Sequence, residues 1–403
     1  MTGLRRLAMP YGPGVESVLG DLAKALDGGE ALLPGPPGGV AGVAGVAGVD
    51  EPDLADHAGL PGEVAFVVGT SGSTGRPKLA MLTADNLVSS ASATHEVLGG
   101  TGRWLLAMPA HHIAGLQVLV RSIVGGTDPV VLDLASGFTA AGFVAATHAL
   151  EASGGRHYTA LVPTQLTRLL EDAAGREALA AYDAVLVGGA ATGSAARAQA
   201  RRAGVHVVTT FGMSETAGGC VYAGVPLPGS LVHIDNDHHV VLGGRTVALG
   251  YLGEPGLTRD VFAVDSDGTR WFRTDDLGGF DDDGRLRIDG RADDLVNTGG
   301  LKVAPGPVED AIVRFVPGVL DAVVIGTTHP TWGQAVSAGV TMRRGAPTPT
   351  LRDVRSALRG ILPDHALPHR LLVLDALPQR GPGKPDRRAL ASAFGETMGD
   401  ADA

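Results

Sequence analysis

The sequence contains a single cysteine, Cys220, and only 4% aromatic residues among its 403 positions. One cysteine excludes an internal disulfide and fits a reducing compartment such as the cytoplasm. We predict that Cys220 is a small packed residue and not a nucleophile. The sequence also lacks an apolar run long enough for a signal-peptide core or a membrane span. We therefore expect a cytoplasmic protein without membrane insertion.

Positive charge is scarce as well, because 32 Lys and Arg stand against 43 Asp and Glu, a formal net charge of −11. This balance argues against a nucleic-acid partner and against an anionic membrane surface. Anionic ligands must therefore be held by local features of the chain. The length and the hydrophobic content of 44% are sufficient for two globular domains.

Glycine, in contrast, is abundant, with 60 residues. Its most informative cluster follows a predicted strand at 63–68 and reads Thr70-Ser71-Gly72-Ser73-Thr74-Gly75-Arg76-Pro77-Lys78. Backbone N–H groups, hydroxyls and a lysine at a strand end can surround one anion, and glycine lets the backbone approach it closely. The spacing fits neither the Walker pattern nor the dinucleotide-binding pattern. The cluster predicts a polyphosphate-binding loop of another kind.

This loop resembles the phosphate loop of the adenylate-forming superfamily, which includes acyl-CoA synthetases, the adenylation domains of peptide synthetases and luciferases. Five further segments resemble the superfamily's motifs and occur in the same order, at 108–116, 209–216, 272–278, 290–300 and 377–384. Six ordered matches cover most of the chain after residue 60.

The predicted secondary structure indicates an α/β fold. Strand-like runs separated by helical patterns predict a largely parallel sheet, and they lie at 104–108, 129–132, 158–162, 184–187 and 205–209. A small α+β unit is predicted after Gly290. The resemblance implies a large N-terminal domain of mostly parallel sheets flanked by helices, with a truncated first subdomain, at 1–292. It also implies a small mobile C-terminal lid domain at 293–403 that carries the catalytic lysine.

The resemblance implies a ligase that uses ATP, Mg²⁺ and CoA to join a carboxylic acid to a thiol through an acyl-adenylate. The phosphate loop, from Thr70 to Lys78, would hold the β- and γ-phosphates. Ser214 would contact the α-phosphate, and Glu215 would hold Mg²⁺. Asp276 would accept hydrogen bonds from the ribose, and Arg291 would reach the ribose or a phosphate.

Further residues receive roles from the same resemblance. Lys384 would bridge the carboxylate and the α-phosphate during adenylation, and Asp293 would be the hinge. His112 would position the acid, whereas His111 is expected to be structural. Gly299 and Gly300 would allow the thiol arm to approach. Gly188, Gly189 and Ala190 would line the adenine and acyl pockets, and Phe211 would stack near adenine. Thr210 and Gly212, on either side of Phe211, would also bind the nucleotide.

Within the superfamily, the segments around His112, Glu215 and Arg291 resemble the 2-succinylbenzoate–CoA ligases of menaquinone synthesis, in their short actinobacterial form. The alternatives are another acyl- or aryl-CoA ligase, an enzyme that loads a carrier protein, and a catalytically inactive homologue that binds nucleotide or acyl-CoA. A monomer and a homodimer are both compatible with the sequence. The sequence departs from the motifs at Asp275, where a glycine is usual, which could alter nucleotide affinity. The second carboxylate of 2-succinylbenzoate needs a cation or hydroxyl donors, for which the sequence offers Arg121, Arg168, Thr164 and Gln165.

Overall fold

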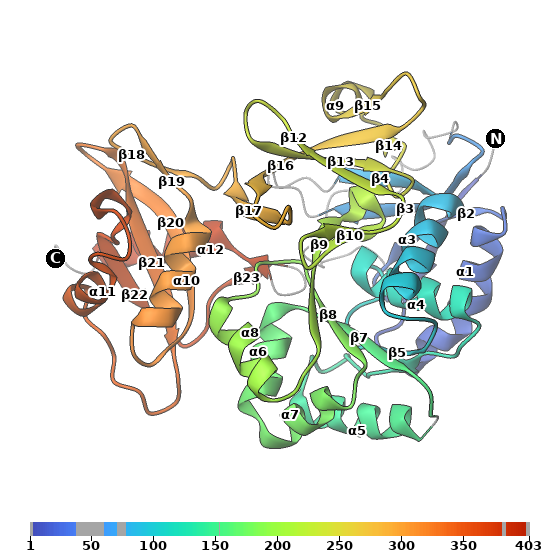
Figure 1. Ribbon diagram of the computed structural model, residues 1–403, viewed down its shortest axis with the longest axis horizontal. Helices are drawn as coiled ribbons and strands as arrows, with labels where there is room; N and C mark the ends of the chain where they lie inside the picture. The colour runs from blue at the N-terminus through green and yellow to red at the C-terminus, as the bar shows by residue number, and fades with distance from the viewer. Residues whose placement is uncertain (1–2, 38–59, 71–77, 153, 381–383, 400–403) are drawn as a thin grey trace.

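The computed structural model describes residues 3–37, 60–70, 78–152, 154–380 and 384–399, without the side chains of residues 380, 384 and 396–399. Figure 1 shows a large N-terminal lobe and a smaller C-terminal lobe, joined near β17 and β18. The low-complexity repeat at 39–49 lies outside the described residues.

Among the described residues, the central sheet of the large lobe has seven strands in the order β11-β10-β9-β8-β7-β5-β6. The pairs from β9 to β6 are parallel, as the alternating pattern predicts. The strands are β5 (Arg103–Leu106), β6 (Val130–Val131), β7 (His157–Leu161), β8 (Ala184–Val187), β9 (Val207–Met213), β10 (Gly218–Tyr222) and β11 (Val225–Pro226).

Helices cover both faces of this sheet. Successive residues of β5 therefore point into two different cores. Trp104 and Leu106 pack into one core with α3 and α4, and Leu105 packs into the other with α5, α6 and α7. Strands buried on both faces carry nearly continuous apolar runs. The helices are α3 (Ala84–Val97), α4 (Ile113–Gly125), α5 (Ala140–Glu151), α6 (Pro163–Glu171), α7 (Ala173–Ala180) and α8 (Ser194–Arg202).

A second sheet, in the order β1-β2-β3-β4-β14, carries the phosphate loop between β3 and β4. Its strand β3 confirms the strand predicted at 63–68. β1, β2 and β3 pair in parallel, whereas β3 with β4 and β4 with β14 are antiparallel. The elements are β1 (Leu4–Ala8), η1 (Pro13–Val18), α1 (Leu19–Leu26), β2 (Ala31–Gly35), β3 (Val64–Thr70), β4 (Lys78–Thr83) and β14 (Gly250–Tyr251).

The third sheet of this lobe is antiparallel and joins β12, β13, β15, β16 and β17. The run Asp281–Gly284 forms the tight turn between β16 and β17, and Gly284 has a φ of +72°. His238 lies in a turn that its N–H closes on the carbonyl of Asp235, and His239 begins β13. The elements are β12 (Ser230–Ile234), β13 (His239–Gly244), α9 (Pro255–Val261), β15 (Phe262–Val264), β16 (Arg270–Phe280) and β17 (Leu286–Arg291).

The C-terminal lobe is a small α+β unit with its own core, which includes Val324, Val336 and Ile312. It touches the large lobe where the backbone N–H of Ser194 donates to Asp310 Oδ1 at 2.8 Å. The elements are β18 (Val296–Thr298), β19 (Leu301–Val303), α10 (Pro305–Phe315), β20 (Val319–His329), β21 (Gly333–Met342), α11 (Leu351–Leu358), η3 (Asp364–Ala366), β22 (Arg370–Val373), β23 (Gln379–Arg380), β24 (Lys384–Pro385) and α12 (Arg387–Gly399). The domain boundary at residue 293 stays a prediction.

Local signals explain several elements. Thr83 is the N-cap of α3, because its side chain accepts from the N–H of Asn86 at 3.1 Å while the Asn86 side chain accepts from the N–H of Thr83 at 2.8 Å. Cys220 is buried, and burial raises the pKa of its thiol to about 12, in agreement with a packed residue. In the part of the chain that the structure describes, every helix is too short or too polar to cross a bilayer.

Candidate active site

A short turn after β9 places Ser214 and Glu215 where the first and second sheets meet. The turn, η2 (Ser214–Thr216), is held by Thr216, whose hydroxyl accepts from the N–H of Met213 at 3.0 Å and donates to the carbonyl of Gly218 at 2.8 Å. The Ser214 hydroxyl donates to the carbonyl of Gly69 at 3.4 Å. The predicted α-phosphate and metal residues therefore lie beside the end of β3, from which the phosphate loop starts.

Glu215 is buried, and its Oε1 accepts a hydrogen bond from the hydroxyl of Tyr251 at 2.8 Å. Burial raises the pKa of Tyr251, and the negative charge of Glu215 raises it further, so the phenol stays a proton donor to the carboxylate. Lys78 places its Nζ 5.3 Å from the centre of the Tyr251 ring. Tyr251 thus connects Glu215, the predicted metal residue, to Lys78 at the end of the predicted phosphate loop.

The two described ends of the phosphate loop face each other across the second sheet. Thr70 of β3 pairs with Lys78 of β4 in an antiparallel register. Both ends therefore lie at the edge of the sheet that the Ser214–Glu215 turn approaches. The intervening predicted ligands lie outside the described residues, and they are Ser71, Gly72, Ser73, Thr74 and Gly75.

The ends of β8 and β9 form another side of the candidate site. A Cβ on Gly188 would lie 2.3 Å from the Thr210 hydroxyl oxygen, so only glycine fits there. Gly189 has a φ of +83°, which an L side chain rarely adopts. A Cβ on Gly212 would lie 2.1 Å from the carbonyl oxygen of Gly218. Ala190 and Phe211 are partly exposed at the same strand ends, so the structure brings all six predicted pocket residues together.

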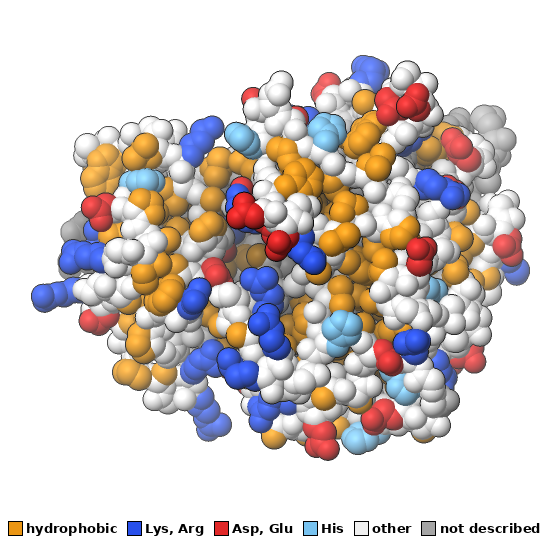
Figure 2. Space-filling view, in the orientation of Figure 1, with side chains coloured by type: hydrophobic (Ala, Val, Ile, Leu, Met, Phe, Trp, Pro, Cys, Tyr) orange, Lys and Arg blue, Asp and Glu red, His pale blue; other side chains and the backbone are white. Residues whose placement is uncertain are grey.

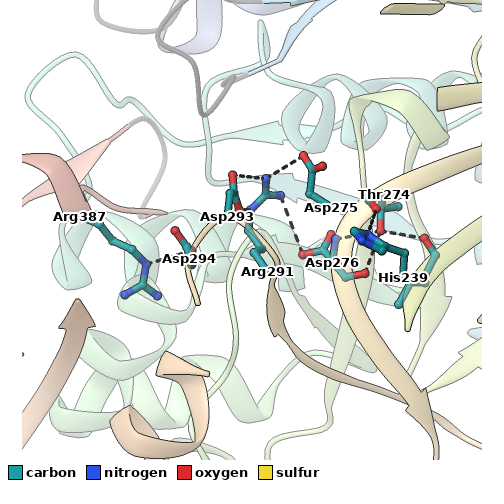
Figure 3. A network of polar contacts seen from close by, with 9 residues as sticks. His239, Thr274, Asp275, Asp276, Arg291, Asp293, Asp294 and Arg387 are labelled. Carbon is teal, nitrogen blue, oxygen red and sulfur yellow. Dashed lines mark hydrogen bonds and ion pairs between the residues drawn. The ribbon is translucent and has the colours of Figure 1, made fainter. Parts of the chain in front are cut away.

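Asp276 and Arg291 face each other across β16 and β17, and Figure 3 shows the polar network around them. Arg291 binds Asp293 with two hydrogen bonds of 2.9 Å, binds Asp275 at 3.1 Å, and lies 4.0 Å from Asp276. Burial alone would lower the pKa of Arg291, but the three carboxylates raise it overall. Asp275 therefore acts as a partner of Arg291, a contact that a glycine could not make.

His112 is the N-cap residue of α4, and its ring lies 4.2 Å from that of His111, measured between ring centres. His111 is buried, and burial lowers its pKa to about 4. A neutral, buried imidazole beside the apolar helix start agrees with the structural role predicted for His111. His112 is less buried than His111, and its role in positioning the acid stays a prediction.

We expect the two buried histidines to make folding stability depend on pH. Burial, with the charge of Arg121 as a smaller cause, lowers the pKa of His95 to about 4, as burial does for His111. An unfolded histidine titrates near pH 6.5, so on acidification the unfolded chain takes up protons first. The free energy of unfolding should therefore fall between pH 6.5 and pH 4, by about 3 kcal/mol per histidine.

Urea unfolding between pH 7.5 and pH 4.5 measures this loss. The variant His111→Asn should show a shallower decrease, whereas His148→Asn should not, because the side chain of His148 is 72% exposed. An unchanged slope in His111→Asn would show that His111 does not carry the effect.

The comparisons with known proteins decide the family. Residues 30–251 match the AMP-binding enzyme family, and residues 307–384 match the C-terminal domain of AMP-binding enzymes. The chain belongs to the AMP-binding enzyme family. A Mycobacterium tuberculosis protein named as a probable 2-succinylbenzoate–CoA ligase is 42% identical over 401 residues, which is 99% of this chain and 100% of that protein.

Two solved structures of AMP-binding enzymes are similar in fold. One is the o-succinylbenzoate CoA synthetase of Bacillus subtilis with its acyl-adenylate intermediate, with a TM-score of 0.69 and 26% identity over 81% of this chain and 69% of that one. The same Bacillus subtilis enzyme with ATP and magnesium has a TM-score of 0.67 and 26% identity over 81% and 70% of the two chains. The expected fold, a large AMP-binding domain with a small C-terminal domain, is confirmed.

Among the residues that the structure describes, Glu215 is a carboxylate that suits a magnesium ion. Mg²⁺ in nucleotide enzymes is commonly held by one or two carboxylates together with substrate phosphates and water. Glu215 lies buried beside the ends of the phosphate loop, and its carboxylate is fixed by Tyr251. The residues present therefore fit a magnesium–nucleotide complex.

The remaining predicted residues of this AMP-binding enzyme belong to the C-terminal lobe. Gly299 and Gly300 form the turn between β18 and β19, where the N–H of Gly299 donates to the carbonyl of Trp332 at 3.0 Å. Figure 1 shows this hairpin on the C-terminal lobe, away from β9. Lys384 is the first residue of β24, and its backbone pairs with that of Arg380. The side chain of Lys384 lies outside the described residues.

Local positive charge is present although the net charge of the chain is negative. Figure 2 shows Lys and Arg side chains on the large lobe where it borders the C-terminal lobe. Helix α8 lies there and carries Arg197, Arg201 and Arg202, with no acidic residue of its own. Anionic ligands can thus meet a favourable local field at the boundary between the lobes.

Tyr251 and Thr216 contact the candidate site residues, and the sequence had assigned neither of them a role. Tyr251 is one of only five tyrosines, and it directly follows a glycine in a short strand, which is the one signal that could have drawn attention to it. Thr216 stood inside a recognised segment but received no role. Its two hydrogen bonds now explain why the Ser214–Glu215 turn has its shape.

Proposed function

We propose that the protein is an ATP-dependent 2-succinylbenzoate–CoA ligase of menaquinone biosynthesis, working in the cytoplasm as a monomer or homodimer. The reaction is 2-succinylbenzoate + ATP + CoA → 2-succinylbenzoyl-CoA + AMP + pyrophosphate. The observation that carries the proposal is the 42% identity with the Mycobacterium tuberculosis relative along the whole length of both chains. The Ser214–Glu215 turn beside the end of β3 and the pairing of Asp276 with Arg291 support the same chemistry.

The first half-reaction must bring two anions together, the acid carboxylate and the α-phosphate of ATP. Catalysis of this kind is mainly positioning and charge stabilisation. Lys78 and the phosphate loop would hold the outgoing pyrophosphate, and Ser214 would donate to the α-phosphate. Glu215 would hold the magnesium ion, which when bound neutralises charge on the ATP phosphates. Asp276 would accept the ribose hydroxyls, with Arg291 held beside it by Asp293.

The second half-reaction needs a different set of residues around the same acyl-adenylate. Asp293 and Asp294 suit a hinge between the lobes, because each forms an ion pair with a different lobe. Asp293 binds Arg291 at the end of β17 in the large lobe, whereas Asp294 binds Arg387 of α12 at 3.1 Å. Rotation about Asp293 would withdraw Lys384 and bring Gly299 and Gly300 to the thiol.

A panel of acids tests the proposed function. The protein with ATP, Mg²⁺ and CoA should convert 2-succinylbenzoate, with a kcat/KM at least about 100-fold above that for benzoate, medium-chain fatty acids or amino acids. Formation of AMP and of the CoA thioester is measured for each acid by chromatography. The physical reason is that a site built for two carboxylates loses the energy of a buried charge contact when one is missing.

Each of the other possible results supports a different function. Turnover of another acid would keep the chemistry and reject the substrate. Formation of an adenylate without transfer to CoA would favour loading of a carrier protein. Binding of AMP without any turnover would favour an inactive homologue.

A further inference from the structure

Asp275 lies beside the proposed hinge, at the position where the motif usually has a glycine. Its Oδ2 accepts a hydrogen bond from Nη2 of Arg291 at 3.1 Å, and Figure 3 shows the two side chains pointing toward each other. The Asp275 side chain is 57% exposed, so packing does not force it into this position. Asp275 is therefore a second anchor for a guanidinium that Asp293 already binds with two hydrogen bonds.

The two anchors belong to differently fixed parts of the chain. Asp275 lies in β16, which pairs with β13, β15 and β17, and its carbonyl accepts from the N–H of Ala292 at 2.9 Å. Asp293 follows β17 and precedes Asp294, which binds Arg387 of the C-terminal lobe. A rotation about Asp293 changes the backbone dihedrals of that residue and leaves β16 and β17 in place. The carboxylate of Asp293 then moves relative to Arg291, whereas that of Asp275 does not.

The third carboxylate near Arg291 is not placed to take over from Asp293. Asp276 Oδ1 lies 4.0 Å from Nη1 of Arg291, which is beyond hydrogen-bond distance. The proposed function also assigns Asp276 to the ribose hydroxyls of the nucleotide. Asp275 is thus the carboxylate that can keep Arg291 paired after Asp293 has moved.

The described orientation of the lobes corresponds to the first half-reaction of the proposed function. Figure 1 shows β23, the partner strand of the Lys384 segment, at the boundary between the lobes. The hairpin that contains Gly299 and Gly300 lies away from β9 in the same view. The second half-reaction therefore requires the C-terminal lobe to leave the described orientation.

The direct contacts between the lobes oppose this departure. The N–H and the hydroxyl of Ser194 donate to Asp310 Oδ1 at 2.8 and 3.0 Å, and Arg343 donates to Glu171 at 3.3 Å. Each of these contacts joins one lobe to the other and is lost when the lobes rotate. The contact of Asp275 lies wholly on the large-lobe side of the hinge and persists.

The persistence of one contact changes the balance between the two orientations. Hydrogen bonds between a guanidinium and a carboxylate are stronger than those between neutral groups. With Asp275, Arg291 keeps such a bond in both orientations. With a glycine, Arg291 would keep its bonds to Asp293 in the described orientation and would have only solvent in their place after rotation. A glycine at this position would therefore favour the described orientation.

We propose that Asp275 is a positioning residue for the second half-reaction, which retains Arg291 when Asp293 moves away and so facilitates rotation of the C-terminal lobe. This inference rests on the proposed function, because it requires two half-reactions in two orientations of the lobes. Asp275 acts through Arg291 and not on the atoms that react.

The kinetic test measures the two half-reactions separately. Asp275→Gly and Asp275→Asn should slow single-turnover formation of the CoA thioester from synthetic 2-succinylbenzoyl-adenylate by about fivefold, the effect of one exposed ion pair. Pyrophosphate exchange into ATP uses the described orientation and should change by less than about twofold. Asp275→Glu keeps the carboxylate and should recover most of the rate of thioester formation.

A matched control removes another carboxylate that binds an arginine near the same strand end. Asp289 of β17 accepts two hydrogen bonds from Arg287, at 2.6 and 3.2 Å. Asp289→Asn should leave both half-reactions unchanged. Thermal unfolding and the dissociation constant of AMP are measured for every variant, and neither should change in Asp275→Asn.

The orientation of the lobes can be measured without turnover. Spin labels on Glu96→Cys of α3 and Arg352→Cys of α11 would report the distance between the lobes, because both positions are exposed. Cys220 is buried and should not be labelled. With CoA and an unreactive sulfamoyl analogue of the adenylate, the unmodified protein should show a second distance besides the one seen with ATP and Mg²⁺. Asp275→Gly should lower the ratio of the second population to the first by about fivefold.

The outcomes separate the role of Asp275 from the function itself. Equal slowing of both half-reactions would overturn the proposal, because it would place the effect in nucleotide binding or folding. Unchanged rates in both Asp275 variants, or an unchanged ratio of the two distances, would overturn it as well. Failure of the unmodified protein to form AMP from any acid would instead reject the proposed function.

Discussion

Replacing Lys384 with alanine is expected to slow acyl-adenylate formation by at least about 1,000-fold, while thioester formation from supplied acyl-adenylate changes by less than about threefold. A lysine is the one group proposed here that would neutralise both the acid carboxylate and the α-phosphate as they meet. Once the adenylate exists, that charge is no longer required. Pyrophosphate exchange into ATP measures the first step, and chromatography of the CoA product from synthetic acyl-adenylate measures the second.

The control for Lys384 removes an exposed cation from the same lobe. Arg352 lies exposed on α11, and Arg352→Ala should leave both half-reactions unchanged. An equal loss of both half-reactions in Lys384→Ala would contradict a residue that acts in one conformation only. Normal adenylation in that variant would remove Lys384 from the mechanism altogether.

Local sequence signals were sufficient for much of the fold. The residues from Thr83 to Leu98 have a helical pattern and form α3, and the Thr83 side chain caps the helix by accepting a hydrogen bond from the N–H of Asn86. The strand at 184–187 has the bounds that its apolar run predicts. These elements are fixed by neighbouring residues, so their patterns can be read directly.

Elements that depend on distant pairing were not predicted. β2 reads Ala-Leu-Leu-Pro-Gly, and proline and glycine are unfavourable inside a strand. It becomes a strand because Leu32 pairs with Phe66 of β3 on one side and β1 pairs along the other. Sheet pairing across such separations overrides local preference.

The candidate site likewise contains residues that the sequence predicts and residues that it does not. Glu215 and Asp276 could be predicted because each lies inside a recognisable motif. Tyr251 could not, because its role comes from a hydrogen bond to a residue 36 positions earlier. The burial of Arg121 on α4 also depends on packing between α3, α4 and β10, which the order of motifs does not contain.

Replacing Glu215 with glutamine is expected to lower the rate of adenylation by at least about 100-fold and to remove most of the Mg²⁺ dependence of ATP binding. Glutamine keeps the size of the side chain and can still accept the hydrogen bond from Tyr251, so the turn should fold as before. What is lost is the negative charge that favours a magnesium–nucleotide complex. Titration calorimetry with ATP at several Mg²⁺ concentrations measures the binding effect independently of turnover.

Two comparisons make the Glu215 prediction specific. AMP, which lacks the β- and γ-phosphates, should bind the Glu215→Gln variant with an affinity within about threefold of the unmodified protein, because a magnesium ion shared with those phosphates no longer contributes. Tyr251→Phe keeps the carboxylate and removes only its hydrogen bond, so its effect should be about tenfold or less. If Glu215→Gln bound ATP with the same Mg²⁺ dependence as the unmodified protein, the metal would have to be held by other groups. If Tyr251→Phe matched Glu215→Gln in every measurement, the orientation of the carboxylate, and not its charge alone, would set the affinity for the metal–nucleotide complex.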